Sequence, residues 1–494
     1  MQHPKKGIDA RLRAAADLVL QTVREIPSPL VLDLGCDHGY LSWYLLRQRQ
    51  DLSVIASDIS AASLRKARML MDPGLYGGRI CFREADGFAA LLPEERPDCA
   101  VLAGMGGRLI LDLVDRGRER LKGTALVLQA NTDLPLLRSG LAEMGFGIQL
   151  ERFAEANGRV YAVLLAGASE PRTLSAKEAY LGAGGPDPGR RMYYQSLRRE
   201  RVAEMRKAAR KRTPKGLQNM EEAAEICRWI AEETGMKSCT VADVERMVGM
   251  IAPYETAEEW DNVGLLLGRK EDPAERVLVA LDVTRDVVEE AEALGCRAIV
   301  SHHPFLFHPV QRVTGDTREG ALMLLMAEKR MAHIAAHTNL DRAPGGVNDA
   351  LIAAVGCGNV RGEGFLRVGD LPEPVSFGAL CGRVAAALSA EVRTYGNPER
   401  IVHALGCCSG SGAEEYKEAM ALGADCFLTG EARHNVALDA MYDGCLLIEA
   451  GHFETERVVC PAFCDALQKT ADALQYNVTF FCSGVDPFGR LKDR

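Results

Sequence analysis

Residues 31–42 read VLDLGCDHGYLS, and this stretch decides the fold of the N-terminal part of the chain. A short apolar run ends at Asp33, glycines follow at Gly35 and Gly39, and a helical pattern comes next. The order predicts a strand, a tight turn and a helix start, which together bring backbone N–H groups against a ligand. A glycine turn alone is as often purely structural as ligand-binding, so the residues around it decide which interpretation holds.

The composition is that of a globular protein with more than one domain. The chain has 494 residues, 47% of them hydrophobic and 26% charged, and no apolar run reaches the length of a membrane span. The polar start, residues 1–13, does not resemble a signal peptide. The 15 cysteines are scattered without Cys-x-x-Cys pairs, which indicates reduced thiols and a cytoplasmic location. Because the net charge is −9, contact with nucleic acid requires a local basic patch.

Strands and helices alternate over residues 1–165, which we predict to form one α/β domain with a doubly wound, Rossmann-like parallel sheet. Ligands of such sheets bind at the carboxyl ends of the strands. The predicted strands are Pro29–Leu34, Ser53–Ser57, Arg79–Glu84, Cys99–Ala103, Ala125–Gln129, Ile148–Phe153 and Val160–Leu165.

Three acidic residues, Asp33, Asp58 and Asp86, close the first three predicted strands. An acid about 20 residues beyond a glycine turn is placed to accept both ribose hydroxyls of a nucleoside, and Asp58 stands at that distance. Asp86 is placed to accept from an adenine amino group. Each acid taken singly is more often a helix cap. Three at successive strand ends predict a pocket in which they converge on one adenosyl group.

The glycine turn lacks the Gly-x-Gly-x-x-Gly pattern that cradles a pyrophosphate, so it favours S-adenosylmethionine over a dinucleotide. The fourth strand ends in AGMGG, residues 103–107, which lets backbone approach the methyl end of the donor. No Asn-Pro-Pro-Tyr or Asp-Pro-Pro-Tyr follows that strand. Since enzymes that methylate exocyclic amines use this motif, its absence indicates another acceptor atom.

These motifs resemble the bacterial TrmK family, the tRNA (adenine-22)-N1-methyltransferases. The resemblance rests on DLGCDHGYL from Asp33, AGMGG from Ala103 and LVLQAN at residues 126–131, and it extends to residue 161. It implies S-adenosylmethionine as cofactor and tRNA as partner. We place the donor site at Asp33, Gly35, Asp37, Gly39, Asp58, Asp86, Gly87, Gly104, Met105 and Gly106. The candidate catalytic residues are Asn131 and His38, although His38 is equally well explained as a structural imidazole in the turn.

The chemistry of this reaction makes few demands on side chains. Adenine N1 has a free lone pair and the sulfonium donor is already activated, so orientation and a dry site supply most of the effect. The target base must leave its stack, which costs a few kcal/mol.

Residues 166–235 read as a basic helical hairpin, a feature that the TrmK family carries after its catalytic domain. Between residues 190 and 215 stand eleven Lys and Arg against Glu200 and Glu204. Such a run can be a solvated helix face, but an excess of positive charge in a protein that is acidic as a whole favours phosphate binding. The predicted nucleic-acid-binding residues are Arg198, Arg199, Arg201, Arg206, Lys207, Arg210, Lys211 and Arg212.

A second α/β domain is predicted over residues 236–494. Five of the ten histidines of the chain lie within residues 302–337, in SHHP from Ser301, in HTNLD from His337 and at two positions between them. Farther on, His452 and Glu456 are four residues apart and share one helix face. Mixed imidazole and carboxylate ligands suit Zn, Fe, Mn or Co, so we predict a metal site.

This half resembles the NIF3 family, also called GTP cyclohydrolase I type 2 homologs, through WDNVGL, SHHP, HTNLD and LTGE. The resemblance implies a dinuclear metal centre in an α/β subunit of a ring-shaped hexamer, hence a homo-oligomer. By position, the metal residues are His302, His303, Asp341, His452 and Glu456, with His337 as a further ligand or a supporting residue. We thus expect a tRNA methyltransferase fused to a dinuclear metal protein. Two alternatives stay open: a metal-dependent nucleotide hydrolase as the main activity, or a non-enzymatic metal-binding scaffold in the C-terminal half.

Overall fold

The computed structural model describes residues 8–182, 187–211 and 213–488. The chain forms two compact units, which are described separately. The first comprises Met1–Glu204 and Glu222–Thr234, and the second comprises Met205–Glu221 and Gly235–Arg494. No helix among the described residues is long and apolar enough to cross a membrane. All fifteen cysteines are free thiols.

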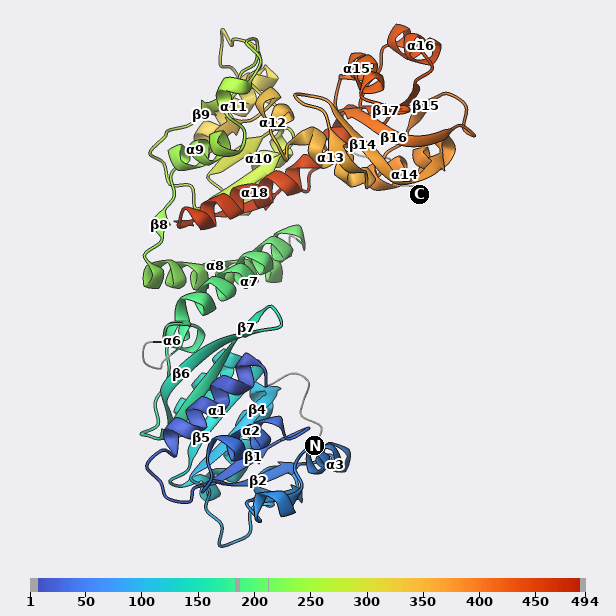
Figure 1. Cartoon of the computed structure of the whole chain (residues 1–494). Helices are drawn as coiled ribbons and strands as arrows, with labels where there is room; N and C mark the ends of the chain where they lie inside the picture. Colours follow the sequence, from blue (N-terminus) through green and yellow to red (C-terminus); the bar gives the residue numbers. More distant parts are fainter. Residues whose placement is uncertain (1–7, 183–186, 212, 489–494) are drawn as a thin grey trace. The chain divides into compact units, whose positions relative to one another are not determined.

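The first unit is built on a seven-stranded sheet of order β3-β2-β1-β4-β5-β7-β6 (Figure 1). Strands β1 to β5 run parallel, whereas β7 is antiparallel to both β5 and β6. The elements are α1 Ala10–Thr22, β1 Leu30–Leu34, α2 Tyr40–Gln48, β2 Ser53–Asp58, α3 Ala61–Leu70, β3 Ile80–Glu84, β4 Cys99–Gly106, α4 Gly107–Gly117, β5 Ala125–Thr132, α5 Leu134–Glu143, β6 Phe146–Ala156, β7 Arg159–Ala168 and α6 Ala176–Leu181.

Both faces of this sheet are covered by apolar helix residues. One core combines α1, α2 and α3 with Val31, Val54, Val101 and Val127. The other combines α4 and α5, and the two helices of the basic segment described next, with leucines of β1, β4 and β5. Burial on both faces explains why these strands are continuous apolar runs. The predicted doubly wound Rossmann-like fold is confirmed, and each predicted strand is present. Two details differ from the prediction. The sheet is not wholly parallel, because β7 runs antiparallel to β5 and β6, and Asp86 stands two residues beyond the end of β3.

The basic segment forms a helical hairpin of α7, Arg190–Lys211, and α8, Pro214–Thr234. The proline at the first position of α8 suits a helix start, since that N–H has no partner in any helix. The hairpin is divided between the two units: its tip, Met205–Glu221, belongs to the second unit and the remainder to the first.

The second unit contains two larger sheets, of orders β20-β10-β11-β12-β9 and β13-β14-β16-β17-β18-β15. Helices α9 and α18 pack on the first sheet, and α13 and α14 lie on one face of the second, with α15 and α16 on the other. The elements are β8 Lys237–Ser238, α9 Val241–Ile251, β9 Gly264–Leu267, β10 Arg276–Ala280, α10 Arg285–Ala293, β11 Ala298–Ser301, α11 Arg318–Glu328, β12 Ala332–Ala335, α12 Thr338–Arg342, α13 Val347–Val355, β13 Gly358–Arg361, β14 Arg367–Ser376, α14 Phe377–Leu388, β15 Arg393–Tyr395, β16 Ile401–Cys408, α15 Tyr416–Ala421, β17 Cys426–Thr429, α16 His434–Tyr442, β18 Leu446–Glu449, α17 His452–Glu456, α18 Val459–Ala473, β19 Tyr476–Asn477 and β20 Thr479–Cys482.

Candidate functional site

The glycine turn after β1 has the geometry that its sequence predicts. Gly35 and Gly39 have φ of 68° and 73°, and Asp37 between them has φ of 46°, a conformation that short polar residues tolerate. A Cβ on Gly39 would lie 2.9 Å from the Cβ of Ala67, so the turn can pack closely on α3 only without a side chain. The N–H of Asp37 donates to the Asp58 carboxylate over 3.0 Å, which ties the turn to the end of β2.

The three acids of the predicted donor pocket have different surroundings. Asp33 is buried and accepts from the Ser42 hydroxyl over 2.6 Å, and burial raises its pKa to about 6. Asp58 accepts from the N–H groups of Asp37 and Ser60. Asp86 is exposed and pairs with Arg116 at 2.8 Å. Because β3, β2 and β1 are neighbours in the sheet, the three acids follow one another along the carboxyl ends of these strands. The bond from Ser42 also connects Asp33 to the first turn of α2.

His38 and Asn131 lie in separate polar networks. The His38 Nδ1 is 2.6 Å from the Asp37 carboxylate and its Nε2 is 3.1 Å from Lys66, so the imidazole is held between the turn and α3. The Asn131 side chain at the end of β5 donates to the Gly104 carbonyl over 2.8 Å. This bond connects it to the glycine-rich end of β4, which also contains Met105 and Gly106.

Arg11, a residue outside every sequence motif considered above, completes the Asn131 network. Its guanidinium donates to the Oε1 of Gln129 over 3.1 Å and to the Oδ1 of Asn131 over 3.2 Å. Gln129 donates to the same Asn131 oxygen. The amide of Asn131 is therefore fixed in one orientation. Arg11 also lies over the Tyr161 ring, 5.5 Å from its centroid. Only the packing of α1 against β5 and β7 brings it there.

The basic residues of the hairpin do not form one uniform surface. Arg198 is buried, Arg201 pairs with Glu204 at 2.8 Å, and Arg206 pairs with Asp465 at 2.5 Å within the second unit. The exposed members that form no ion pair with a described carboxylate are Arg199, Lys207, Arg210 and Lys211. Arg212 lies outside the described residues.

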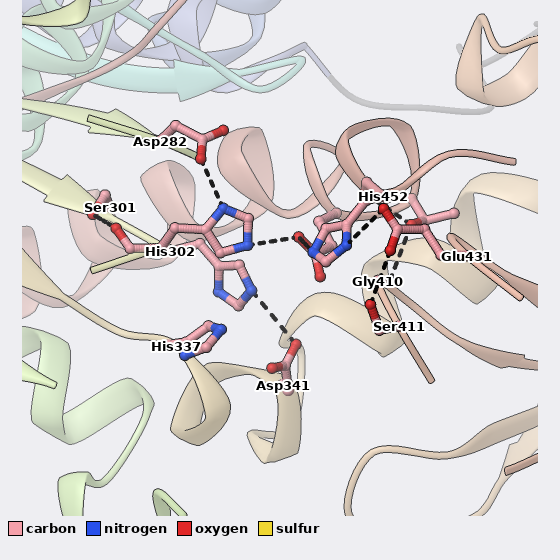
Figure 2. A network of polar contacts seen from close by, with 12 residues as sticks. Asp282, Ser301, His302, His337, Asp341, Gly410, Ser411, Glu431 and His452 are labelled. Atoms are coloured by element: carbon pink, nitrogen blue, oxygen red, sulfur yellow. Dashed lines mark hydrogen bonds and ion pairs between the residues drawn. The ribbon is translucent and has the colours of Figure 1, made fainter. Parts of the chain in front are cut away.

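The histidines and acids of the second unit gather at one place. His302 and His303 follow β11, His337 immediately precedes α12 and Asp341 lies within it (Figure 2). His452 and Glu456 are the first and last residues of α17. Potential ligand atoms of His302, His303 and His337 lie within 4.8 Å of one another, as do those of His303, His452 and Glu456. His303 belongs to both groups and connects them.

Each of the three clustered imidazoles is oriented through its Nδ1 atom. The Nδ1 of His302 is 3.0 Å from the Ala336 carbonyl, that of His303 is 2.9 Å from Asp282, and that of His337 is 2.8 Å from Asp261. With these atoms occupied, the Nε2 atoms of His302 and His337 are left for a ligand, as in metal-binding histidines supported by a carboxylate or carbonyl. The Nε2 of His303 lies 2.9 Å from the carboxylate of Glu456, a member of the same ligand group. Sequence reasoning missed Asp261 and Asp282 as members of the site, although Asp261 lies in the quoted WDNVGL motif.

Comparison with known proteins divides the chain along the same lines. Residues 239–487, slightly more than half of the chain, match the family model of Duf34/NIF3 (NGG1p interacting factor 3). The chain belongs to the Duf34/NIF3 family. Residues 31–231 match the model of TrmK, tRNA (adenine(22)-N(1))-methyltransferase, so the N-terminal part is of the TrmK family. Both predicted family assignments are confirmed.

Individual relatives agree with this division. A GTP cyclohydrolase 1 type 2 homolog of Clostridium acetobutylicum is 30% identical over 264 residues, which are 51% of this chain and 98% of the relative. The crystal structure of a hypothetical protein from Staphylococcus aureus is 26% identical and covers 52% of this chain and all of its own, with a TM-score of 0.50. A Streptococcus pneumoniae structure described as a candidate tRNA (m1A22) methyltransferase is 27% identical and covers 46% of this chain and 98% of its own, with a TM-score of 0.39.

The NIF3 part has a donor set that fits a divalent metal. The Nε2 of His302 and an oxygen of Asp341 are buried 3.7 Å apart, and neither has a hydrogen-bond partner among the described residues. Buried polar atoms without partners are rare in native proteins, and a cation between these two would satisfy both. Neutral imidazoles with carboxylates suit Zn, Fe, Mn or Co.

The electrostatics of the NIF3 site depend on burial and on ion pairs. Burial lowers the pKa of His302 to about 3 and raises the pKa of Asp341 well above its usual value. Burial also opposes the charge on His303, but hydrogen bonds to Asp282 and Glu456 outweigh it and raise the pKa of His303 to about 10. The pKa of Glu456 is lowered despite its burial, because His303 and His452 bond to its carboxylate.

Proposed function

We propose that the TrmK part transfers a methyl group from S-adenosylmethionine to N1 of an adenine in tRNA, at position 22. The observation that carries this proposal is the TrmK match over a turn in which the Asp37 N–H closes onto Asp58 at the strand ends. When bound, S-adenosylmethionine would supply an activated methyl group. Asp58 and the turn residues Gly35 to Gly39 would hold its adenosyl moiety.

The chain's own part in this reaction is to bind and orient. The acceptor nitrogen has a lone pair and no proton to lose, so no general base is required. The Asn131 amide, held by Arg11 and Gln129, is placed to position the target base beside the end of β4. A side chain fixed in this way accelerates the reaction by holding the target base in one orientation toward the methyl group.

The test is methylation of unmodified tRNA by the purified chain with isotopically labelled S-adenosylmethionine, followed by nucleoside mass spectrometry. We expect labelled 1-methyladenosine, and we expect its loss in an Asp58→Asn variant that still unfolds like the wild type. The Glu84→Gln variant, altered at the exposed end of the neighbouring strand, serves as control. Ribose or exocyclic methylation alone would refute the assignment of the acceptor atom.

We further propose that the exposed cations of the hairpin, Arg199, Lys207, Arg210 and Lys211, contact tRNA phosphates. Their support is the excess of positive charge on α7 in a protein of net charge −9. Phosphate contacts release counterions, so tRNA affinity should fall steeply with salt.

For the NIF3 part we propose a dinuclear metal centre with hydrolase activity toward nucleotides. The supporting observation is the pair of ligand clusters that share His303. Metal ions held by these two clusters would supply a nucleophilic hydroxide and polarise a phosphoryl group. His302→Ala should lower both bound metal, measured by inductively coupled plasma mass spectrometry, and metal-dependent turnover in a nucleotide panel. His403→Ala, at an exposed position of β16, is the control.

One outcome would redirect the proposal for the NIF3 part. A wild-type chain that holds metal but turns over no nucleotide would favour the metal-binding scaffold. The homo-oligomer, a hexamer by the family resemblance, is tested by light scattering of the full chain with and without metal.

A further inference from the structure

A pocket of about 730 Å³ lies beside the candidate metal centre of the NIF3 unit. Its wall includes His303 and Asp282 on one side, and residues 304–319, which lead from β11 to α11, form most of the rest. Because His303 is both a candidate metal ligand and a wall residue, a molecule in this pocket lies against the metal centre. The volume is in the usual range for small-molecule sites.

The pocket wall contains two arginines, Arg312 and Arg318, and two acids, Asp282 and Glu319. Arg312 and Arg318 are exposed, and no described residue forms an ion pair or hydrogen bond with either guanidinium. Of the two wall acids, Asp282 already accepts from His303, which leaves Glu319 in the first turn of α11. Guanidinium groups bind phosphate through paired N–H donors, so two of them beside a metal centre favour a phosphorylated ligand.

The aromatic residue Phe307 lines the pocket, and a second aromatic residue, Trp260, is not a wall residue but lies against Phe307. Phe307 has 38% of its surface exposed, and its ring lies edge-on to Trp260 with centroids 5.9 Å apart. Trp260 is 61% exposed, and both rings lie near the His337 imidazole, at centroid distances of 6.1 and 6.3 Å. Exposed aromatic faces of this kind stack with the bases of nucleotides, at about 1–3 kcal/mol for each base in nucleic-acid complexes.

We propose that this pocket binds a nucleoside monophosphate, with its phosphate between Arg312, Arg318 and the metal centre and its base against Phe307 and Trp260. The proposal rests on the proposed metal centre and adds the substrate class. It concerns binding and does not require that the bound nucleotide is hydrolysed. The separate contacts for phosphate and for base predict that neither part alone binds as well as the whole nucleotide.

The test is calorimetric titration of the zinc-loaded full chain with AMP, GMP, CMP and UMP, and with adenosine and ribose 5-phosphate. Saturating S-adenosylhomocysteine occupies the predicted adenosyl site of the TrmK part, so that nucleotide uptake there does not confuse the result. We expect at least one monophosphate to bind at least tenfold more tightly than both fragments.

Variants separate the two halves of the pocket. Arg312→Ala/Arg318→Ala should weaken the monophosphate at least tenfold with zinc content unchanged, and Phe307→Ala should weaken the monophosphate but not ribose 5-phosphate. Arg269→Ala, an exposed arginine outside the pocket, should change neither. Failure of all four monophosphates to bind, or equal binding by the double variant, would overturn the proposal.

Equal binding of ribose 5-phosphate and the monophosphates would also overturn it, since the base would then make no contact. The outcome for the proposed hydrolase is distinct. A chain that binds a monophosphate without turnover contradicts the hydrolase and retains this pocket. A chain that takes up no zinc but binds the nucleotide through Arg312 and Arg318 contradicts the metal centre alone.

Discussion

Gly410 shows how closely backbone approaches the candidate metal ligands. Its φ is 56°, and a Cβ built there would lie 2.3 Å from a carboxylate oxygen of Glu456 and 3.1 Å from the Nε2 of His452. The neighbouring Gly430 is equally confined, since its Cβ would lie 2.6 Å from the Gly410 carbonyl. Glycine at these positions therefore makes room for the ligand pair.

Gly410→Ala should reduce the metal content of the chain. The added methyl group must displace Glu456 or His452, and the left-handed backbone adds strain. We expect at least a tenfold loss of metal affinity in a competition titration with a chromogenic chelator. Gly444→Ala, which also has positive φ but open space around its Cβ, controls for backbone strain. Equal affinities of the wild type and the Gly410 variant would show that the ligands have room to move.

Asp33 predicts a pH dependence of stability in the TrmK part. Its folded pKa of about 6 lies above the usual 3.8, so between those values the folded state holds a proton that the unfolded state has lost. The contribution of Asp33 to the free energy of unfolding is fully present below about pH 4 and is lost as pH rises through about 6. A shift of about two units corresponds to at most about 3 kcal/mol.

Asp33→Asn should remove this dependence. The amide oxygen still accepts from Ser42, and no charge is buried at neutral pH. In urea titrations without S-adenosylmethionine, we expect the variant to gain stability over the wild type at pH 7 and to lose that advantage at pH 4. A difference that does not change with pH would contradict the raised pKa.

At the scale of elements, Arg138 on α5 connects three parts of the TrmK unit. It pairs with Glu151 on β6 at 2.8 Å, and both side chains are fully buried. Its guanidinium also donates to the carbonyls of Ala179 and Tyr180 at the end of α6, over 2.8 and 2.9 Å. The pair therefore fixes the helix that leads into the hairpin.

Arg138→Met should lower the free energy of unfolding of the first unit by about 3–5 kcal/mol. The Glu151 carboxylate would stay buried, and among the described residues Arg190, 3.3 Å away, would be left to balance its negative charge. The double variant Arg138→Met/Glu151→Leu should recover most of the loss. Arg172→Met breaks the exposed Arg172–Glu178 pair and should have little effect. Urea unfolding followed by circular dichroism measures all three, and a double variant as unstable as the single one would contradict this account.

At the scale of the whole molecule, the hairpin belongs to both units, and its basic residues have different partners. Arg206 in the tip donates to the Phe480 carbonyl over 2.8 Å and pairs with Asp465, so it takes part in the packing of the NIF3 unit. Glu221, on the returning helix, pairs with Arg276 at 2.7 Å in the same unit. The neighbouring Lys207 and Lys211 are exposed.

The salt dependence of tRNA binding should separate these roles. Lys207→Ala and Lys211→Ala should each reduce the slope of log affinity against log salt by about 0.7–0.9, because each removes one phosphate contact. Arg206→Ala should leave the slope unchanged and lower the stability of the NIF3 unit. Fluorescence anisotropy with labelled tRNA between about 50 and 300 mM salt measures the slopes. A reduced slope in Arg206→Ala would place that residue on the RNA.

The sequence alone was sufficient to predict the strands of the first unit, the glycine turn after Asp33 and the cluster of histidines that begins after Ser301. These features depend on local periodicity and on residues a few positions apart, such as His452 and Glu456. The tertiary structure decided which distant residues complete each site. Arg11 contacts Asn131, 120 positions away in the sequence, and Asp261 contacts His337, 76 positions away. The tertiary structure also divides the basic hairpin between the two units. Such pairs are set by how helices pack on sheets, which no local pattern specifies.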